Sequence, residues 1–175
     1  MLQFHVTAKL AKALKVRPEE APVSDESDWL ECWYVRDIPL DLPLDALLFT
    51  NAATFYSLVH PFDRRERIDE IVGVFQQRLE HITGRDFTSD PSAFRVCKTA
   101  SRRVTGCMNE LALMVEYEVE RHLQGDGVRL EVIEDHLNNG IVGGLFPETE
   151  FTKRLENDGR SRSKPTKTPH LGLVK

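Results

Sequence analysis

The sequence has no long hydrophobic run and no visible export signal. Its longest uninterrupted apolar stretch is Leu111 to Val115, far short of the roughly 20 apolar residues that a membrane span requires. The first residues, MLQFHVTAKL, show no basic start followed by an apolar core. Apolar residues still make up 41% of the chain, close to the usual globular share. We therefore exclude membrane, fibrous and wholly disordered classes and predict a soluble, cytoplasmic protein.

Cysteine is scarce, and its spacing argues against both disulfides and metal. The chain has three cysteines, an odd number, and no two of them form a C-x-x-C pair. Its six histidines form no H-x-x-x-H or H-E-x-x-H pattern. Such spacings are the usual marks of disulfide frameworks and zinc sites. The sequence therefore predicts no metal, and the cysteines are interpreted as small core residues.

Basic charge is sparse in most of the chain. The sequence contains 23 basic and 28 acidic residues, and the segment 160–175 holds five of the basic ones and no acidic one. Residues 1–159 therefore carry 18 basic against 28 acidic side chains, a net charge of −10. Nucleic-acid wrapping needs clustered Lys and Arg, so the body does not suit it. We predict one globular domain over 1–158 and a basic, disordered tail over 159–175.

Hydrophobic periodicity predicts an α+β fold. Aromatic and β-branched runs indicate strands, and apolar residues at helical spacing indicate amphipathic helices. The expected strands lie near 2–6, 30–38, 46–51 and 54–60, with a further short strand near 94–98. The expected helices lie near 8–16, 64–83, 101–123, 128–139 and 147–157. We expect a mostly antiparallel sheet covered by the two long helices, with the shorter helices toward the C-terminus.

Local signals mark the ends of the long helices. Asp63 and Glu66 have the spacing of a capping box, and Gly84 follows the first long helix where a left-handed cap belongs. The pattern V-E-Y-E-V-E over 115–120 alternates as a strand would, but the apolar stripe before it favours a helix throughout 101–123.

The common catalytic and nucleotide-binding motifs are absent. The sequence contains no G-x-x-x-x-G-K, no G-x-G-x-x-G and no G-x-S-x-G. Gly143 and Gly144 lie between two apolar stretches and are interpreted as a turn. We therefore predict no cofactor and assign no catalytic residue.

Two short segments place polar side chains beside the expected core. Thr50 and Asn51 end an apolar strand, where such side chains either cap a turn or face a ligand at the end of a sheet. The second segment begins the helix near 101–123 and contains Thr99, Arg102, Arg103 and Asn109.

Arginines are unusual in a first helical turn, because a helix N-terminus is already partly positive. Free N–H groups, hydroxyls and guanidinium groups together suit an anion. Alternatively, the arginines pair with acidic side chains, and Gly106 lets another element pack closely. A hydrolytic centre is disfavoured because no base or nucleophile is obvious nearby. The candidate ligand-binding residues are Thr50, Asn51, Thr99, Arg102, Arg103 and Asn109.

Three short segments resemble a small bacterial family of uncharacterised proteins. They are T-x-K-L at Thr7 to Leu10, L-F-T-N-x-x-T-x-x-S at Leu48 to Ser57, and T-x-x-R-x-x-x-G-x-M-N at Thr99 to Asn109. The resemblance covers most of 1–155 and brings no known activity. It implies that Thr50, Asn51, Arg102 and Asn109 share a surface.

The sequence leaves three functions open. We favour a non-catalytic binding or regulatory module that recognises a protein partner or a small anion. The alternatives are a phosphate-directed enzyme of unrecognised type and nucleic-acid binding through the basic tail. We expect no membrane partner, and the oligomeric state is not predicted.

Overall fold

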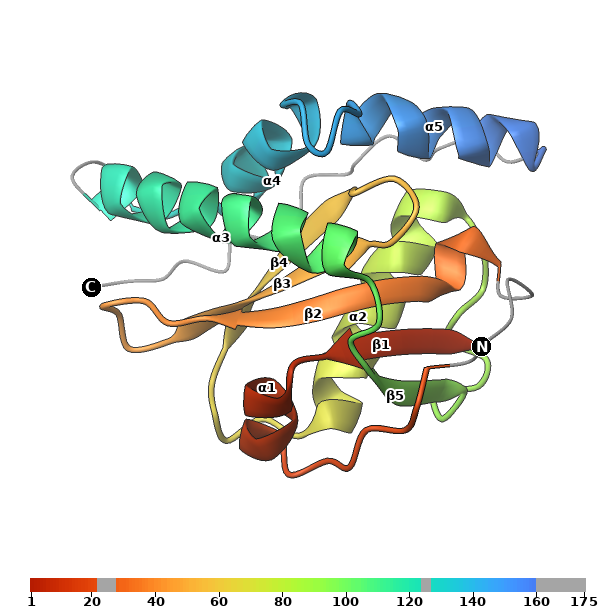
Figure 1. Cartoon of the computed structure of the whole chain (residues 1–175), viewed down its shortest axis with the longest axis horizontal. Coiled ribbons are helices and arrows are strands. Elements are labelled where there is room, and N and C mark those ends of the chain that lie inside the picture. The colour runs from red at the N-terminus through yellow and green to blue at the C-terminus, as the bar shows by residue number, and fades with distance from the viewer. Residues whose placement is uncertain (22–27, 124–126, 160–175) are drawn as a thin grey trace.

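Five strands form one mixed sheet at the centre of the structure (Figure 1). This computed structural model describes residues 1–21, 28–123 and 127–159. The strands are β1 (Leu2–Val6), β2 (Cys32–Ile38), β3 (Asp45–Asn51), β4 (Ser57–Phe62) and β5 (Phe94–Lys98). The helices are α1 (Ala8–Ala13), the 3-10 turn η1 (Trp29–Glu31), α2 (Ile68–Thr83), α3 (Arg102–Leu123), α4 (Leu130–Asn139) and α5 (Pro147–Asn157).

The predicted α+β class is confirmed, but the expectation of a mostly antiparallel sheet is wrong. The strand order is β4-β3-β2-β1-β5. β1 is parallel to both β2 and β5, whereas β2, β3 and β4 are antiparallel neighbours. Short links produce antiparallel neighbours, and parallel neighbours need long crossovers. The sequence shows the short links directly, but nothing local reveals that β1 pairs with the distant β5.

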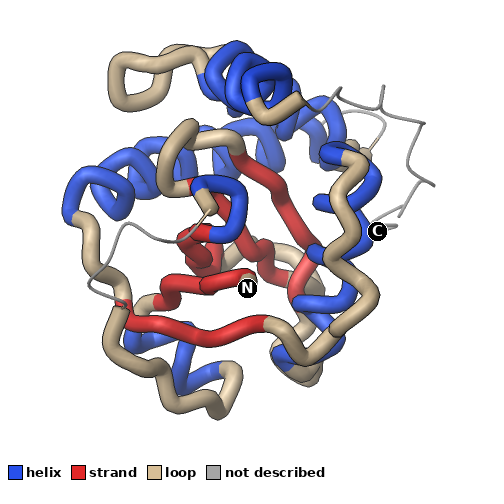
Figure 2. The backbone as a smooth tube through the Cα atoms, turned by 90° about the vertical axis from the view of Figure 1, so that its right-hand side faces the viewer, coloured by secondary structure: helices blue, strands red, loops and turns tan. Residues whose placement is uncertain are grey.

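Helices cover both faces of the sheet, and Figure 2 shows the strands enclosed between them. α2 packs on one face against an aromatic cluster in which Phe75 lies 5.2 Å from Phe4, 4.7 Å from Phe49 and 4.9 Å from Trp33 between ring centroids. α3 and α4 cover the opposite face with a separate apolar cluster. In the described part of the chain, none of the helices has both the length and the apolar character needed to cross a membrane.

The helix ends follow the predicted signals only in part. Gly84 takes the left-handed conformation, with φ of 68°, and ends α2 as expected. The pair Asp63 and Glu66 forms a turn before α2 instead of its cap, because Glu66 Oε2 accepts the N–H of Asp63 at 3.0 Å. Arg67 is the residue that precedes the helix, and Glu70 accepts its N–H at 2.9 Å. α2 therefore begins at Ile68, later than the predicted residue 64.

Side chains from α2 and α4 close the exposed edge of β4. Asn138 accepts the Ser57 N–H at 2.7 Å and donates to the Ser57 carbonyl oxygen at 2.8 Å. Glu134 accepts the Val59 N–H at 2.6 Å, and Arg78 donates to the Val59 carbonyl oxygen at 2.8 Å. An uncovered edge strand invites pairing with another chain, and these contacts occupy the groups that would do so.

The turn at Gly143 and Gly144 brings the backbone against the core under α3. Gly143 has a φ of +57°, and a Cβ there would lie 2.7 Å from Phe55 Cε2 and 2.9 Å from Cys107 Sγ. Gly144 has a φ of +83°, but a Cβ there would meet nothing within 4 Å. Substitutions at these two glycines therefore distinguish the effect of backbone strain from the effect of steric crowding.

We predict that Gly143→Ala lowers the free energy of unfolding by about 2–4 kcal/mol, since left-handed strain and overpacking add at this position. Gly144→Ala should lose only about 1 kcal/mol, because strain alone acts there. Urea denaturation of both variants gives the comparison. If both variants lost the same free energy of unfolding, the steric crowding at Gly143 would make no contribution, which would contradict the prediction.

Candidate functional site

The start of α3 is held by Ser101. Its Oγ accepts the N–H of Val104 at 3.3 Å, as an N-cap does. Its own N–H donates to Tyr34 Oη at 2.8 Å, which ties the helix to β2. The helix then runs without interruption to Leu123. The prediction of a helix over 101–123 is confirmed, including the half with strand-like alternation.

The two arginines of the first turn of α3 have different environments. Arg103 lies with its guanidinium carbon 5.1 Å from the Phe55 ring centroid and donates to the Gly143 carbonyl oxygen at 3.3 Å. It therefore fastens α3 to the loop after α4. Arg102 is exposed and pairs with no carboxylate of the described residues. Thr99, in the link between β5 and α3, is also exposed.

Asn109 follows Arg102 on the same side of α3, two turns further along. Its Oδ1 accepts a hydrogen bond from Arg36 on β2. Gly106 lies between them, and a Cβ on it would meet nothing within 4 Å. The expectation that another element packs closely at Gly106 is therefore wrong. Its effect is to leave bare helix backbone between Arg102 and Asn109.

Thr50 and Asn51 have no exposed surface. Thr50 Oγ1 lies 3.0 Å from Ser57 Oγ across the hairpin. Asn51 Oδ1 accepts the backbone N–H groups of Ala53 and Thr54, both at 3.1 Å. These contacts are those of residues that cap a turn. The four residues named by the family resemblance therefore do not share a surface.

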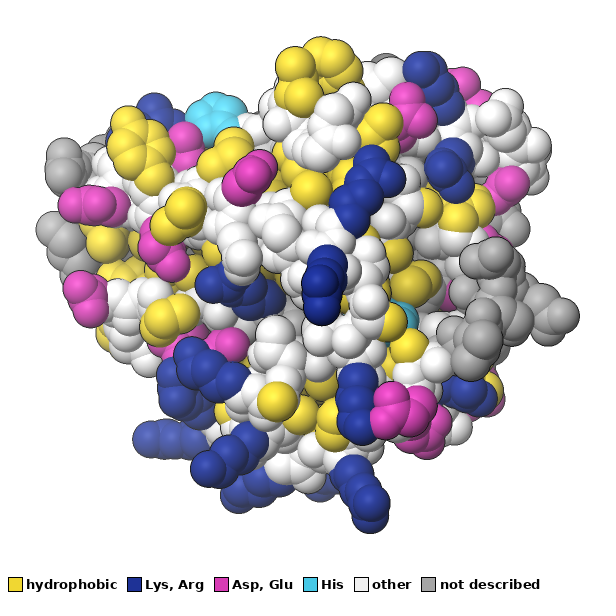
Figure 3. Space-filling model, in the orientation of Figure 1, with side chains coloured by type: hydrophobic (Ala, Val, Ile, Leu, Met, Phe, Trp, Pro, Cys, Tyr) yellow, Lys and Arg dark blue, Asp and Glu magenta, His cyan; other side chains and the backbone are white. Residues whose placement is uncertain are grey.

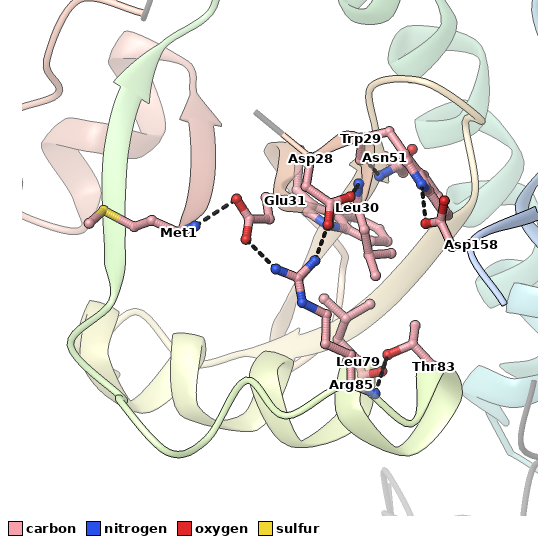
Figure 4. Close-up of polar contacts among 11 residues, drawn as sticks. Met1, Asp28, Trp29, Leu30, Glu31, Asn51, Leu79, Thr83, Arg85 and Asp158 are labelled. Carbon is pink, nitrogen blue, oxygen red and sulfur yellow. Dashed lines mark hydrogen bonds and ion pairs between the residues drawn. The ribbon is translucent and has the colours of Figure 1, made fainter. Parts of the chain in front are cut away.

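The amide nitrogen of Asn51 extends this role to the turn η1. It donates to the carbonyl oxygens of Trp29 at 3.0 Å and Cys32 at 3.4 Å. Figure 4 shows the polar network beyond it, in which Arg85 binds both Asp28 and Glu31. The Arg85 Nη2 to Glu31 Oε1 distance is 2.7 Å. Arg85, Asp28 and Glu31 are paired with opposite charges, so this network stabilises the fold.

Cations gather on the face formed by α1, the end of β2 and the start of α3, and all of them except the half-buried Arg36 are exposed. Figure 3 shows Lys and Arg side chains concentrated over α1 on this side of the molecule. We call this surface the basic face and define it by Lys12, Lys15, Arg17, Arg36 and Arg102. Except for Arg36, which binds Asn109, these residues have no partner among the described residues. Lys9 is excluded because it pairs with Asp37 at 2.9 Å.

A hollow of about 520 Å³ borders the basic face. Its lining residues are Arg17, Pro18, Glu19, Glu20 and Lys98. Lys98 is paired with Glu20, so both carboxylates and cations line the hollow. The mixed charge makes this hollow a poor anion pocket by itself.

A thiol and an imidazole that the sequence analysis passed over lie in contact under the start of α3. Cys32 Sγ is 3.3 Å from His5 Nε2. Burial raises the pKa of Cys32 to about 11 and lowers that of His5. Cys97 and Cys107 are buried as predicted, whereas Cys32 is partly exposed. Among the described residues, no group of three or more Cys, His, Asp or Glu side chains is arranged to hold a metal ion.

Comparison with known proteins places the chain in a family. Residues 3–150 match the family described as Domain of unknown function (DUF6933). The chain belongs to this family. No curated protein and no solved structure matches it. Membership confirms the resemblance to a family of unknown function and adds no activity.

We predict that Asn51→Ala lowers the free energy of unfolding by about 3 kcal/mol or more. The substitution leaves buried N–H and carbonyl groups without partners, and each such group costs about 1–3 kcal/mol. The matched control is Asn109→Ala at an exposed position, which should change stability by about 0.5 kcal/mol or less. Chemical denaturation of both variants measures the difference, and similar losses would contradict the role assigned to Asn51.

We also predict that stability falls as the pH drops below about 6.5. Burial lowers the pKa of His5 and of His60 from the ordinary value of 6.5. Below that pH the unfolded chain binds protons at these histidines that the folded chain does not bind. The free energy of unfolding is therefore highest above pH 6.5 and decreases below it. Urea denaturation between pH 8 and pH 5.5 tests this. His60→Gln should show a shallower loss, and constant stability over this range would refute the assignment.

Proposed function

We propose that this protein is a non-catalytic binding module that recognises an anionic group on the basic face. One observation carries the proposal. Residues 1–159 have a net charge of −10. Cations of α1, its following segment and α3 that have no partner among the described residues nevertheless gather on one side. An anion would be attracted to this side at long range and repelled by the rest of the surface.

The position of the basic face supports the same conclusion. β1, β2 and β5 are mutually aligned, so their carboxyl ends lie at one edge of the sheet. α1 follows β1, and the link to α3 follows β5. Ligands of open sheets with parallel strands bind beyond such carboxyl ends. The cations therefore lie near the carboxyl ends of the parallel strands, where the sheet topology leads us to expect a ligand.

The chemistry of these groups favours phosphate or carboxylate oxygens. Arginine presents a planar fork of donors that matches such groups with two hydrogen bonds. Within the described part of the chain Arg102 has this fork free, and the bare backbone at Gly106 leaves room beside it. Asn109 and Thr99 add polar groups nearby. The ligand is a small anion or an acidic segment of a partner protein, both of which offer these oxygens.

A phosphate-directed enzyme is less well supported. It would require Arg102 or Arg103 and Asn109 to converge with a carboxylate in one pocket. Arg103 is held by Phe55 and Gly143 instead, and Asn109 by Arg36. Nucleic-acid binding through the tail stays a prediction, because residues 160–175 lie outside the described part of the chain.

The expected compartment is the cytoplasm. The three cysteines of the chain are all free, which fits a reducing environment. We therefore infer that the ligand is a cytoplasmic anion or protein.

We predict that the protein binds inorganic phosphate, ATP or a hexaglutamate peptide, with an affinity that falls as salt is added. Arg102→Ala should weaken the binding by about 10-fold to 100-fold, because a hydrogen bond to a charged group contributes about 1.5–3 kcal/mol. Isothermal titration at low ionic strength measures both effects.

The matched control is Arg129→Ala. Arg129 is exposed and directly precedes α4, beyond the far end of α3, so its loss should leave the affinity unchanged. Absence of binding to all three probes, or equal weakening by both substitutions, would defeat the proposal.

A further inference from the structure

The contact between Cys32 and His5 has the arrangement of a thiol with its general base. His5 lies on β1 beside Tyr34 of β2 and beside Cys97 of β5. Cys32 is two residues before Tyr34, so both side chains point to the same face of the sheet. His5 and Cys32 are 27 positions apart in the chain, and the parallel register of β1 and β2 brings them together.

The hydrogen-bond partners assign the tautomer of His5. Its Nδ1 lies 3.0 Å from the carbonyl oxygen of Lys98, and a carbonyl oxygen can only accept. Nδ1 therefore carries the hydrogen, and Nε2 carries the lone pair. That lone pair faces Cys32 Sγ at 3.3 Å, so the thiol donates to the imidazole.

The ring of His5 is also fixed in orientation. It stacks on the Tyr34 ring with 4.6 Å between centroids and 8° between planes. Tyr34 is fixed in turn by the N–H of Ser101 at 2.8 Å. A nucleophile in contact with a base, and a base oriented by a third group, is the general arrangement of an activated side chain.

The pair rests in its neutral form. Burial raises the pKa of Cys32 to about 11 and lowers the pKa of His5. The titratable neighbours are Tyr34 and Cys97, whose pKa values burial also raises. Near pH 7 the thiol keeps its proton while the imidazole is free to take one, which is the resting state that general-base catalysis requires.

Access distinguishes Cys32 from the other two thiols. Cys97 has no exposed surface and Cys107 is 8% exposed, whereas Cys32 is only partly buried. Cys32 is therefore the most exposed of the three cysteine residues and the one whose thiol contacts a base. Uncharged apolar compounds are favoured, because Cys32 packs against the apolar cluster under α3.

We propose that Cys32 is a site of covalent acylation, with His5 as the general base and a small activated ester or thioester as the acyl donor. Sγ attacks the carbonyl carbon of the donor while the S–H proton moves to His5 Nε2. The carbon bond to the leaving group then breaks, and the leaving alkoxide or thiolate takes the proton from Nε2. The products are a thioester on Cys32, a neutral leaving group and neutral His5.

The test treats the full-length protein with p-nitrophenyl acetate and locates the acetyl groups by peptide mass spectrometry. We expect Cys32 to react at least about tenfold faster than Cys97 or Cys107, with release of p-nitrophenol, which then ionises to the coloured phenolate in solution. No acetylation of Cys32, or equal rates at all three cysteines, would overturn the proposal.

The pH profile and a variant separate base assistance from simple exposure. An unassisted thiol with a pKa near 11 reacts about tenfold faster per pH unit from 7 to 9. Assistance by His5 gives a rate that is nearly constant over that range, because the imidazole is already unprotonated. A tenfold rise per unit would overturn the role of His5.

His5→Phe keeps a ring to stack on Tyr34 and removes the base, so the acetylation rate of Cys32 should fall about 100-fold. An unchanged rate would also overturn the role of His5. Circular dichroism shows whether the variant is folded, and if it is not, the pH profile of the natural protein decides alone.

Discussion

The side chain of Asn51 fixes how the hairpin, the turn η1 and the start of β2 meet. Its oxygen organises the turn over 51–54, and its nitrogen holds the carbonyl oxygens of Trp29 and Cys32. Because the residue has no exposed surface, water cannot replace any of these partners. The same amide helps to hold Cys32, whose carbonyl oxygen also accepts the Ala52 N–H at 3.0 Å. The same amide sets η1 in place for the ion pairs of Arg85.

The mixed sheet divides the molecule into two regions with different chemistry. In the antiparallel half, β3 and β4 are buried, and α4 closes the edge of β4 with Asn138 and Glu134. In the parallel half, strands end at a common edge next to exposed cations, and the thiol and imidazole pair lies on the adjoining face. Binding and reactivity are therefore both expected in the parallel half, while the antiparallel half serves as its support.

Local sequence patterns predicted most helices and strands. The features that they did not predict depend on pairing between strands that are distant in the sequence. The strand over 94–98, the left-handed cap at Gly84 and the helix that begins at Pro147 follow from sequence neighbours alone. The direction of β1 against β5 does not, nor does the contact of His5 with Cys32, because both require the register of distant strands. The prediction of close packing at Gly106 was wrong because no other element lies next to this glycine. Arg102 was identified because arginine is disfavoured in a first turn.

The packing of α5 has a consequence for how the chain reaches its native state. Phe151 stacks on Tyr56 at 4.2 Å and meets the Trp29 ring at 5.4 Å between centroids. During synthesis these aromatic rings emerge from the ribosome long before their cover does. The hydrophobic surface around Trp29 and Tyr56 therefore stays open until nearly all of the described sequence has been made. Contacts between such distant segments form late and slow folding.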